Sequence, residues 1–387
     1  MSAVVPLVPV ARPVLDEREA DAARRAILSG WVTQGPEVAA FEREFAEAIG
    51  ARFACATSSC TTALHLALLA AGVGPGDEVV TVSHSFIATA NAIRYCGAIP
   101  VFVDIQADTF NIDPDRVERA IGARTRALLV VHQLGMPCDL ARLVAMARRH
   151  GVAVVEDAAC AIGSEVLWDG EWQRIGRPHG DLACFSFHPR KLLSTGDGGM
   201  VTTNDEAADG QLRLLRQHGM GVPDTVRHAS SQVVFESYPV LGFNYRLTDI
   251  QAAIGREQLK RLPALVSRRR ELADRYRAQL AGLGGVRLPV EPAWAKTNWQ
   301  SFAVGLDPAL DQRTVMQRML DEGVATRRGV MNAHTEAAYP PGSWRAPEGL
   351  SAGEHATATT IVLPLFHQMT VDEQDRVVAA LARAVAA

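Results

Sequence analysis

Lysine is scarce in this chain, although basic residues are not. Lys and Arg together number 39 among 387 residues, yet only Lys191, Lys260 and Lys296 are lysines. An amine can lose its proton and attack a carbonyl carbon, whereas a guanidinium in a protein stays protonated. A lysine that is kept in such a chain therefore suggests chemistry rather than charge. Lys260 and Lys296 lie in polar surroundings typical of a surface, but Lys191 follows an apolar segment.

Three further absences exclude whole classes of protein. No apolar run is long enough to cross a bilayer, and the N-terminus lacks the basic start of a signal peptide, which predicts a soluble cytoplasmic protein. The net charge of −4 comes without a basic tract, so we expect no nucleic-acid partner. The six cysteines form no CxxC pair and no zinc spacing, which favours buried reduced thiols over a metal site.

The motifs of several enzyme classes are also missing. The chain has no P-loop, no GxSxG elbow and no HExxH. The glycine-rich run 72–77 precedes an expected strand instead of linking a strand to a helix, so its context excludes a dinucleotide-binding loop.

Short apolar runs alternate with helical patterns between about residues 50 and 205. The expected strands are Glu78–Val82, Ile99–Val103, Ala127–His132, Val152–Glu156, Ala183–Phe187 and Met200–Thr203. The expected helices between them are Thr61–Ala71, Ile87–Cys96, Asp139–His150 and Asp205–His218. This alternation predicts an α/β fold with a largely parallel sheet that is covered by helices on both faces. Ligands of such folds bind at the carboxyl ends of the strands.

The length of the chain favours two domains. We expect a large domain over 1–250, with an N-terminal arm over about 1–15, and a smaller α+β domain over 251–387. Residues 221–245 are loop-rich, and a long helix from Asp249 to about Leu283, broken near Pro263, is expected to lead into the second domain.

Lys191 lies in the segment DLACFSFHPRKLLSTGDGGM, just after the expected strand that ends near Ser186 and Phe187. A lysine at such a strand end is partly desolvated, which is expected to lower its pKa and make its amine nucleophilic. The glycines that follow let the backbone pass close to a bulky ligand. The alternative is a solvated lysine before a glycine-rich turn.

Four other segments offer groups that complement an amine. Asp157 ends the strand VAVVED and could reach a ligand or cap the next helix. The run TSSCTTALH, which contains Ser59 and Cys60, leads into a helix whose N-terminus suits a phosphate, or is simply N-capped. Phe86 could lie against a planar ring or belong to the core, and the loop around Asn244 could meet a ligand or a partner chain.

Together these segments provide a phosphate cradle, a stacking face, an acid and an amine in separate loops of one α/β domain. Pyridoxal phosphate (PLP) requires these groups: a lysine that binds it as a Schiff base, and a carboxylate at the pyridinium nitrogen. The carboxylate keeps that nitrogen protonated so that the ring can accept electrons, while the lysine acts as general acid and base.

The chain also resembles a known family over nearly its whole length, the DegT/StrS-type sugar aminotransferases of PLP fold type I. The matching blocks are GPEVAAFEREFA, SSCTTALHLALLAAGVGPGDEVV, FIATANAIRYCGAIPVFVD, VVEDAACAIG, FSFHPRKLLSTGDGGM, GFNYRLTDIQAAIG and LPLFHQMT. The resemblance implies a mixed, mostly parallel seven-stranded sheet that holds PLP, a smaller C-terminal domain, and a homodimer with shared active sites.

The resemblance also assigns a role to each candidate residue. It implies that Lys191 forms the Schiff base, that Asp157 pairs with the pyridinium nitrogen and that Phe86 stacks on the ring. For the phosphate it implies backbone N–H groups of Ser59 and Cys60, the hydroxyl of Ser186, and Asn244 from the neighbouring subunit. Cys160 stands where the family usually has Gln or His near the 3′-oxygen, and a thiol is a poor hydrogen-bond donor.

The reaction implied is a transamination in which PLP alternates with pyridoxamine phosphate (PMP). Related sugar dehydratases have His in place of Lys191, so the lysine favours amination. L-Glutamate or L-glutamine is the expected amino donor, and a nucleotide-linked keto-deoxysugar is the expected acceptor. The alternatives are a free cyclitol ketone as acceptor, a non-catalytic PLP-binding regulator, or a PLP lyase or aldolase. Arg327, Arg328 and His334 could hold a diphosphate or a donor carboxylate, or form a solvated basic turn.

Overall fold

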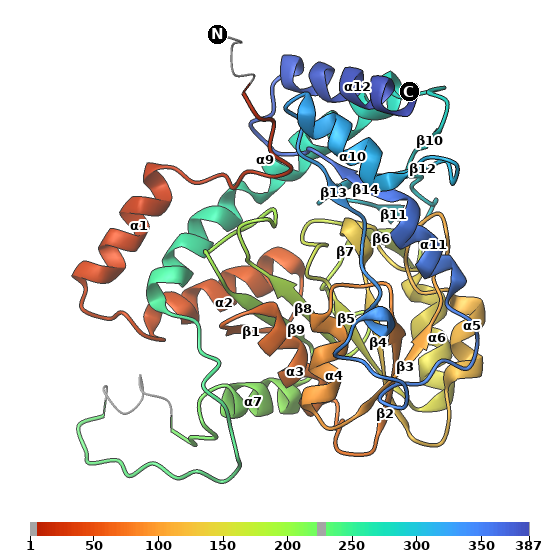
Figure 1. Ribbon diagram of the computed structural model, residues 1–387. Coiled ribbons are helices and arrows are strands. Elements are labelled where there is room, and N and C mark those ends of the chain that lie inside the picture. Colours follow the sequence, from red (N-terminus) through yellow and green to blue (C-terminus); the bar gives the residue numbers. More distant parts are fainter. Residues whose placement is uncertain (1–5, 223–229, 387) are drawn as a thin grey trace.

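The computed structural model describes residues 6–222 and 230–386 (Figure 1). Its main sheet has seven strands in the order β1-β9-β8-β5-β4-β2-β3, and β9 alone among them runs antiparallel to its neighbours. The strands of this sheet are β1 (Phe53–Thr57), β2 (Glu78–Val82), β3 (Ile99–Val103), β4 (Thr125–Val131), β5 (Ala153–Asp157), β8 (Leu182–Ser186) and β9 (Gly199–Thr203). The predicted mixed, mostly parallel seven-stranded sheet is confirmed.

Helices cover both faces of this sheet. Those whose apolar residues pack on one face are α3 (Cys60–Ala70), α4 (Ala88–Tyr95) and α7 (Glu206–Leu215). Those that pack on the other face are α2 (Pro36–Ile49), α5 (Pro114–Ala120), α6 (Leu140–His150) and part of α9 (Asp249–Gln279). The strands are buried on both sides, which explains why they are continuously apolar in sequence instead of alternating.

A second apolar core lies in the C-terminal part of the chain. It is built around a four-stranded sheet in the order β10-β12-β14-β13. Its strands are β10 (Val286–Arg287), β12 (Phe302–Leu306), β13 (Arg327–Arg328) and β14 (Thr360–Leu363). The helices of this part are α10 (Gln312–Asp321), α11 (Ser351–Thr359) and α12 (Val371–Ala386), with the short turn η2 (Ala333–Thr335) between β13 and α11. A second short turn, η1 (Gln133–Gly135), follows β4.

Two features cross the predicted boundary between 1–250 and 251–387. Val8 pairs with Val324 and belongs to the C-terminal core, so the N-terminal segment packs on the second part of the chain. A small sheet joins β6 (Glu165–Trp168) and β7 (Glu171–Arg174) to β11 (Ala295–Lys296). The division into two domains at residue 250 stays a prediction.

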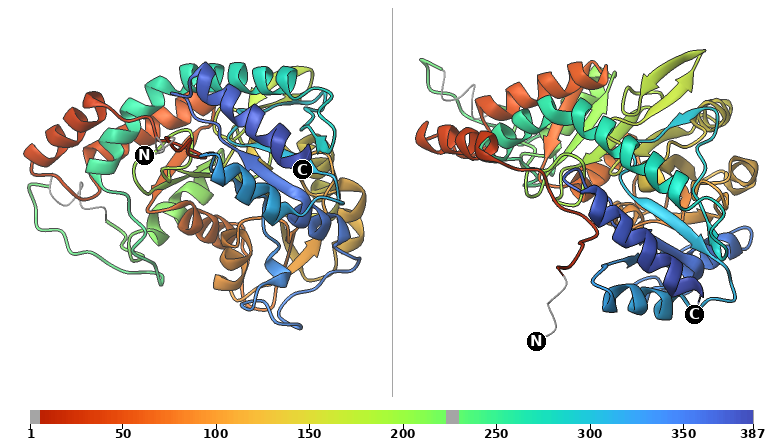
Figure 2. Two further views of the ribbon diagram at one scale, coloured as in Figure 1. Left: turned by 45° about the horizontal axis from the view of Figure 1, so that its top comes forward. Right: turned by 90° about the horizontal axis from the view of Figure 1, so that it is seen from above.

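The long helix α9 differs from its prediction because it is not broken at Pro263. It runs along the molecule from α1 (Glu17–Leu28) to the C-terminal core (Figure 2). Leu262 packs in the core of the large sheet, whereas Leu272 and Tyr276 pack in the C-terminal core. Proline removes one helical hydrogen bond, and we attribute the continuity of α9 to this packing on both sides of Pro263.

The loop-rich stretch expected at 221–245 lies partly outside the described residues, at 223–229. Residues 230–241 form an extended segment without a helix or strand, which projects away from the main sheet (Figure 1). Within the described ranges, no helix is long and apolar enough to cross a membrane.

Candidate active site

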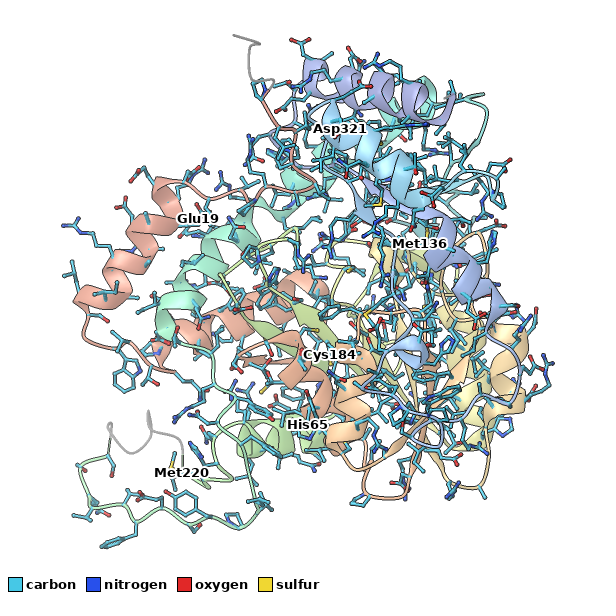
Figure 3. The ribbon with its side chains drawn as sticks, viewed as in Figure 1. Glu19, His65, Met136, Cys184, Met220 and Asp321 are labelled. Atoms are coloured by element: carbon cyan, nitrogen blue, oxygen red, sulfur yellow. The ribbon has the colours of Figure 1, made fainter. Side chains whose placement is uncertain are left out.

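The carboxyl edge of the large sheet gathers most of the predicted residues. Asp157 is the last residue of β5 and Ser186 the last of the neighbouring parallel strand β8. Cys184, two residues before Ser186, is labelled near the middle of the molecule in Figure 3. Phe86 follows β2, and α3 begins at Cys60 after β1. Because the ends of parallel strands meet at one edge, residues far apart in sequence come together there.

Lys191 lies in the loop between β8 and β9, with its amine 2.9 Å from the Cys160 sulfur. Burial by itself lowers the pKa of Lys191, but Cys160, Cys60 and Asp157 outweigh burial, so the pKa lies above its ordinary value. The predicted fall in the pKa of Lys191 is therefore wrong for the free amine. Neighbouring groups that can carry negative charge stabilise the ammonium form more than desolvation opposes it.

Asp157 is buried, and both of its carboxylate oxygens accept a hydrogen bond. Oδ2 accepts one from the Thr89 hydroxyl at 2.8 Å, and Oδ1 accepts one from the Ala159 N–H at 3.2 Å. Burial is the main cause that raises the pKa of Asp157, and these two bonds reduce the rise. In the described ranges no Arg or Lys nitrogen lies within 4.0 Å of this carboxylate. A fixed, buried carboxylate without a paired cation fits the protonated ring nitrogen of PLP.

The N-terminus of α3 forms the candidate phosphate cradle. Ser59 is its N-cap, and the Ser59 N–H donates to the Thr62 hydroxyl at 3.1 Å in a capping box. The Ser59 N–H is thus already engaged, whereas Cys60 is the first residue of the helix, where N–H groups have no partner within the helix. The predicted N-cap is confirmed, and the predicted phosphate contact of Cys60 suits this position better than that of Ser59.

Gly199 shows how closely the backbone approaches this cradle. It pairs with Ser186 on one side and with Thr57 on the other. A Cβ at Gly199 would lie 2.5 Å from the Ser59 carbonyl and 2.8 Å from the Cys60 nitrogen. Only glycine fits here, and this absence of a side chain brings Ser186 and the start of α3 to the same place.

Electrostatics links the cradle to the acid and the amine. Burial raises the pKa of the Cys60 thiol most, the nearby Asp157 carboxylate raises it further, and Lys191 lowers it. Cys60 therefore lies within reach of both predicted catalytic groups. The structure brings Cys60, Asp157, Cys160 and Lys191 together.

Phe86 does not belong to the core, because 65% of its surface is exposed. Its loop is tied to Asp157: the Ser85 hydroxyl lies 2.8 Å from that of Thr89, which donates to Asp157. An exposed ring on a loop anchored to the acid is available to cover one face of a planar ligand.

Asn244 is exposed, and it contacts residues on both sides of its loop. Its side-chain oxygen accepts from Arg246 at 3.2 Å, and it forms an isolated bridge with Gln217. The next residue, Tyr245, accepts a backbone hydrogen bond from Ser58 at 2.8 Å, just before the cradle. The predicted reach of Asn244 to a neighbouring subunit stays a prediction.

Arg327, Arg328 and His334 of the C-terminal part do not form one cluster. The His334 ring hydrogen-bonds with the Ser83 hydroxyl at 2.6 Å and with the Glu354 carboxylate at 3.1 Å. Arg327 and Arg328 are exposed on β13. Burial lowers the pKa of Arg327, and the positive charge of the nearby Arg190 lowers it further.

Thr89, Asn298 and Gln300 are residues of the site that sequence reasoning missed. Thr89 lies in the block FIATANA, three residues after Phe86, so the register of that block could have indicated it. Asn298 and Gln300 contact the loops of Cys160 and Lys191 from more than 100 residues away in sequence. No local sequence pattern predicts such contacts. In the described ranges, no three His, Cys, Asp or Glu side chains are grouped as metal ligands.

Comparisons with known proteins agree with this geometry. The model of the DegT/DnrJ/EryC1/StrS aminotransferase family matches residues 13–382. The aminotransferase TlmJ from Streptoalloteichus hindustanus is 35% identical over 98% of this chain and 99% of its own, with a TM-score of 0.88. DesV from S. venezuelae, solved with a ketimine intermediate, is 35% identical over 98% of each chain, with a TM-score of 0.87. Spr1654 from Streptococcus pneumoniae in its PMP form is 25% identical over 98% of this chain and 99% of its own, with a TM-score of 0.90, and a PLP form is also known.

Proposed function

Because the chain belongs to the DegT/DnrJ/EryC1/StrS aminotransferase family, which makes it a PLP-dependent aminotransferase of the sugar type, we propose a more specific reaction. In this reaction an amino group moves from L-glutamate or L-glutamine to a keto-deoxysugar linked to a nucleoside diphosphate. The aminotransferase TlmJ and DesV, which was solved with a ketimine intermediate, both with nearly full coverage, support the reaction type.

One observation carries the assignment of residues. Asp157, Cys60, Cys160 and Lys191 converge beside an open helix N-terminus, and the buried carboxylate among them has no paired cation in the described ranges. When bound here, PLP supplies an electron sink and an aldehyde carbon to which Lys191 can attach.

The chain's own residues then have distinct tasks. Asp157, oriented by Thr89, holds the proton on the ring nitrogen. The Cys60 N–H and the Ser186 hydroxyl bind the phosphate, and Phe86 covers one face of the ring. With PLP bound, the Lys191 Nζ would be the base that takes a proton from the substrate carbon and the acid that returns one.

We further propose that two copies of the chain share their active sites. Three apolar side chains of the extended segment 230–241 are strongly exposed: Val233 at 84%, Phe235 at 88% and Leu241 at 89%. Exposed apolar groups in one segment favour a protein–protein contact. Asn244 comes three residues after the end of this segment, so a copy that covers the segment lies near Asn244.

Mixing two inactive variants tests the shared site. We expect Lys191→Ala and Asn244→Ala subunits to regain activity when they are unfolded and refolded together, because one site of each mixed dimer has both residues intact. The Asn244→Ala protein alone should bind PLP more weakly. Absence of recovery, with mixed dimers verified by mass, would contradict the shared site.

Lys191→Ala tests the central assignment. We expect loss of the covalent lysine–cofactor bond that borohydride fixes, and a fall in transamination rate of at least about 10²–10⁴-fold, the usual contribution of acid–base catalysis. Lys260→Ala and Lys296→Ala are matched controls, since they are the other lysines of the chain. Retention of borohydride-fixed cofactor by Lys191→Ala would show that the lysine is misassigned.

The substrate is tested on the wild-type protein loaded with PLP. Excess L-glutamate or L-glutamine should remove the visible absorbance of the lysine-bound cofactor as PMP forms. A screen of nucleotide-linked keto-sugars and cyclitol ketones, read by product mass, then identifies the acceptor. No spectral change with any amino acid would favour a non-catalytic regulator.

A further inference from the structure

The loop between β11 and β12 contains a short strained segment, Asn298–Trp299–Gln300. Trp299 is buried and adopts φ 50°, a left-handed conformation that is costly for a bulky residue. The buried Arg269 of α9 donates to the carbonyl groups of both Trp299 and Gln300, at 3.0 and 3.1 Å. Such backbone strain persists only where the surrounding contacts hold it in place.

Gln300 binds the backbone on both sides of Lys191. Its side-chain oxygen accepts from the Leu192 N–H at 3.0 Å, and its side-chain nitrogen donates to the Arg190 carbonyl at 2.5 Å. The side chain is buried, so these bonds are shielded from water. One amide thus fixes the peptide groups that flank the lysine.

Asn298 binds the loop that carries Cys160. Its side-chain nitrogen donates to the carbonyl groups of Cys160 and Ile162, both at 2.8 Å. Its side-chain oxygen accepts from the backbone N–H of Gln300 at 2.8 Å, which couples the Asn298 side chain to the backbone of Gln300. Asn298 is fully buried.

We propose that Asn298 and Gln300 are positioning residues that set the place of the Lys191 amine relative to the cofactor. The Lys191 amine contacts the Cys160 sulfur. Gln300 binds the backbone beside Lys191, and Asn298 binds the backbone of Cys160. This inference rests on the proposed role of Lys191. It adds that the C-terminal part of the chain, through Arg269 and the strained turn, determines the geometry of the lysine.

If the side chains of Asn298 and Gln300 only joined the two parts of the chain, their removal would change the stability of the protein alone. A positioning role affects chemistry as well, because displacement of the amine changes both its proton affinity in the bound state and its reach to the substrate carbon. The two roles therefore differ in the pH at which the visible absorbance of the lysine-bound cofactor titrates.

The test compares Gln300→Ala with Gln374→Ala in the PLP-loaded protein. Gln374 is a matched control because it is fully buried and its amide donates to the Leu272 carbonyl at 2.7 Å, within the C-terminal core. We expect Gln300→Ala to shift the titration midpoint by at least about half a pH unit and to lower kcat about tenfold or more, with a smaller change in KM. Gln374→Ala should lower the melting temperature and leave the midpoint unchanged.

Gln300→Met and Asn298→Ala complete the set. Gln300→Met keeps the length of the side chain, adds no charge and loses both bonds to the Lys191 backbone, so we expect a shift in the same direction as with Gln300→Ala, and it decides the matter if Gln300→Ala does not fold. An unchanged midpoint and kcat in the folded Gln300 variants would overturn the positioning role. Failure of the proposed function is distinguished by Lys191→Ala, which would then keep its borohydride-fixed cofactor.

Discussion

Two buried carboxylates near the large sheet have opposite surroundings. Glu42 on α2 is 2.7 Å from Arg213 and also pairs with Arg216. Burial alone would raise the pKa of Glu42, but Arg216 and then Arg213 outweigh it and lower the pKa. In the described ranges the Asp157 carboxylate at the end of β5 accepts hydrogen bonds from a hydroxyl and a backbone N–H, and burial raises its pKa although these bonds and the Lys191 charge lower it.

The two carboxylates therefore differ in role: Glu42 stabilises the fold, whereas Asp157 is a candidate ligand-binding group. The charge of Glu42 is compensated within the chain, and its bonds extend to the Ala56 N–H while Arg216 binds the Ala56 carbonyl, so the cluster fastens α2 and α7 to β1. The charge of Asp157 is held in place by two hydrogen bonds, and the nearby Lys191 charge offsets only part of the cost of its burial. A buried charge that the fold compensates only in part is available to a ligand that brings the opposite charge.

Removing the compensated charge should have the largest effect on stability. Glu42→Gln leaves the buried Arg216 without its anion, and breaking one side of a buried pair costs about 3–5 kcal/mol. Unfolding by denaturant, followed by circular dichroism, measures the loss. The lysine–cofactor bond of any folded Glu42→Gln protein should persist, because Glu42 lies outside the site.

Glu44→Gln provides the matched control on the same helix. Glu44 pairs with Arg256 at 2.6 Å, but both side chains are about one-third exposed. Exposed pairs contribute about 0–1 kcal/mol. Equal destabilisation by Glu42→Gln and Glu44→Gln would contradict the distinction between the two carboxylates.

The candidate site residues that could be predicted from the sequence are those whose signals are local. β2 and β3 have the predicted bounds, Asp157 ends a mostly apolar strand, and Lys191 comes shortly after another. β1 was not predicted, because its sequence FACAT contains small residues with little strand preference. Its strand conformation depends on pairing with β9, more than 140 residues away.

The contacts that support the site could not be read from the sequence. Glu42 and Arg216 are separated by 174 residues, and Asn298 and Cys160 by 138. A side chain that binds the backbone of a distant loop leaves no periodicity or motif in its own segment. Pro263 shows the converse, since a strong local signal for a helix break yields to packing on both sides of it.

Asp157→Asn should have the smaller effect on stability, and of the opposite sign. In cofactor-free protein the substitution removes a charge whose burial outweighs its hydrogen bonds and the nearby Lys191 charge, so we expect a gain on the order of 1 kcal/mol near neutral pH. Transamination should nevertheless fall sharply, because an amide cannot hold the proton on the ring nitrogen. Thermal unfolding of the cofactor-free proteins, together with rates after PLP is added, measures both effects.

The pH dependence of this gain identifies its cause. The pKa of Asp157 is raised in the folded state, so between the ordinary value of 3.8 and the folded value the folded protein binds a proton that the unfolded chain has lost. The wild type therefore loses stability relative to Asp157→Asn as the pH rises through the folded pKa. The gain should vanish below about pH 4 and be complete above the folded pKa. A gain that stays constant from pH 4 to pH 8 would mean that altered hydrogen bonding to Thr89 and Ala159, and not the buried charge, is responsible.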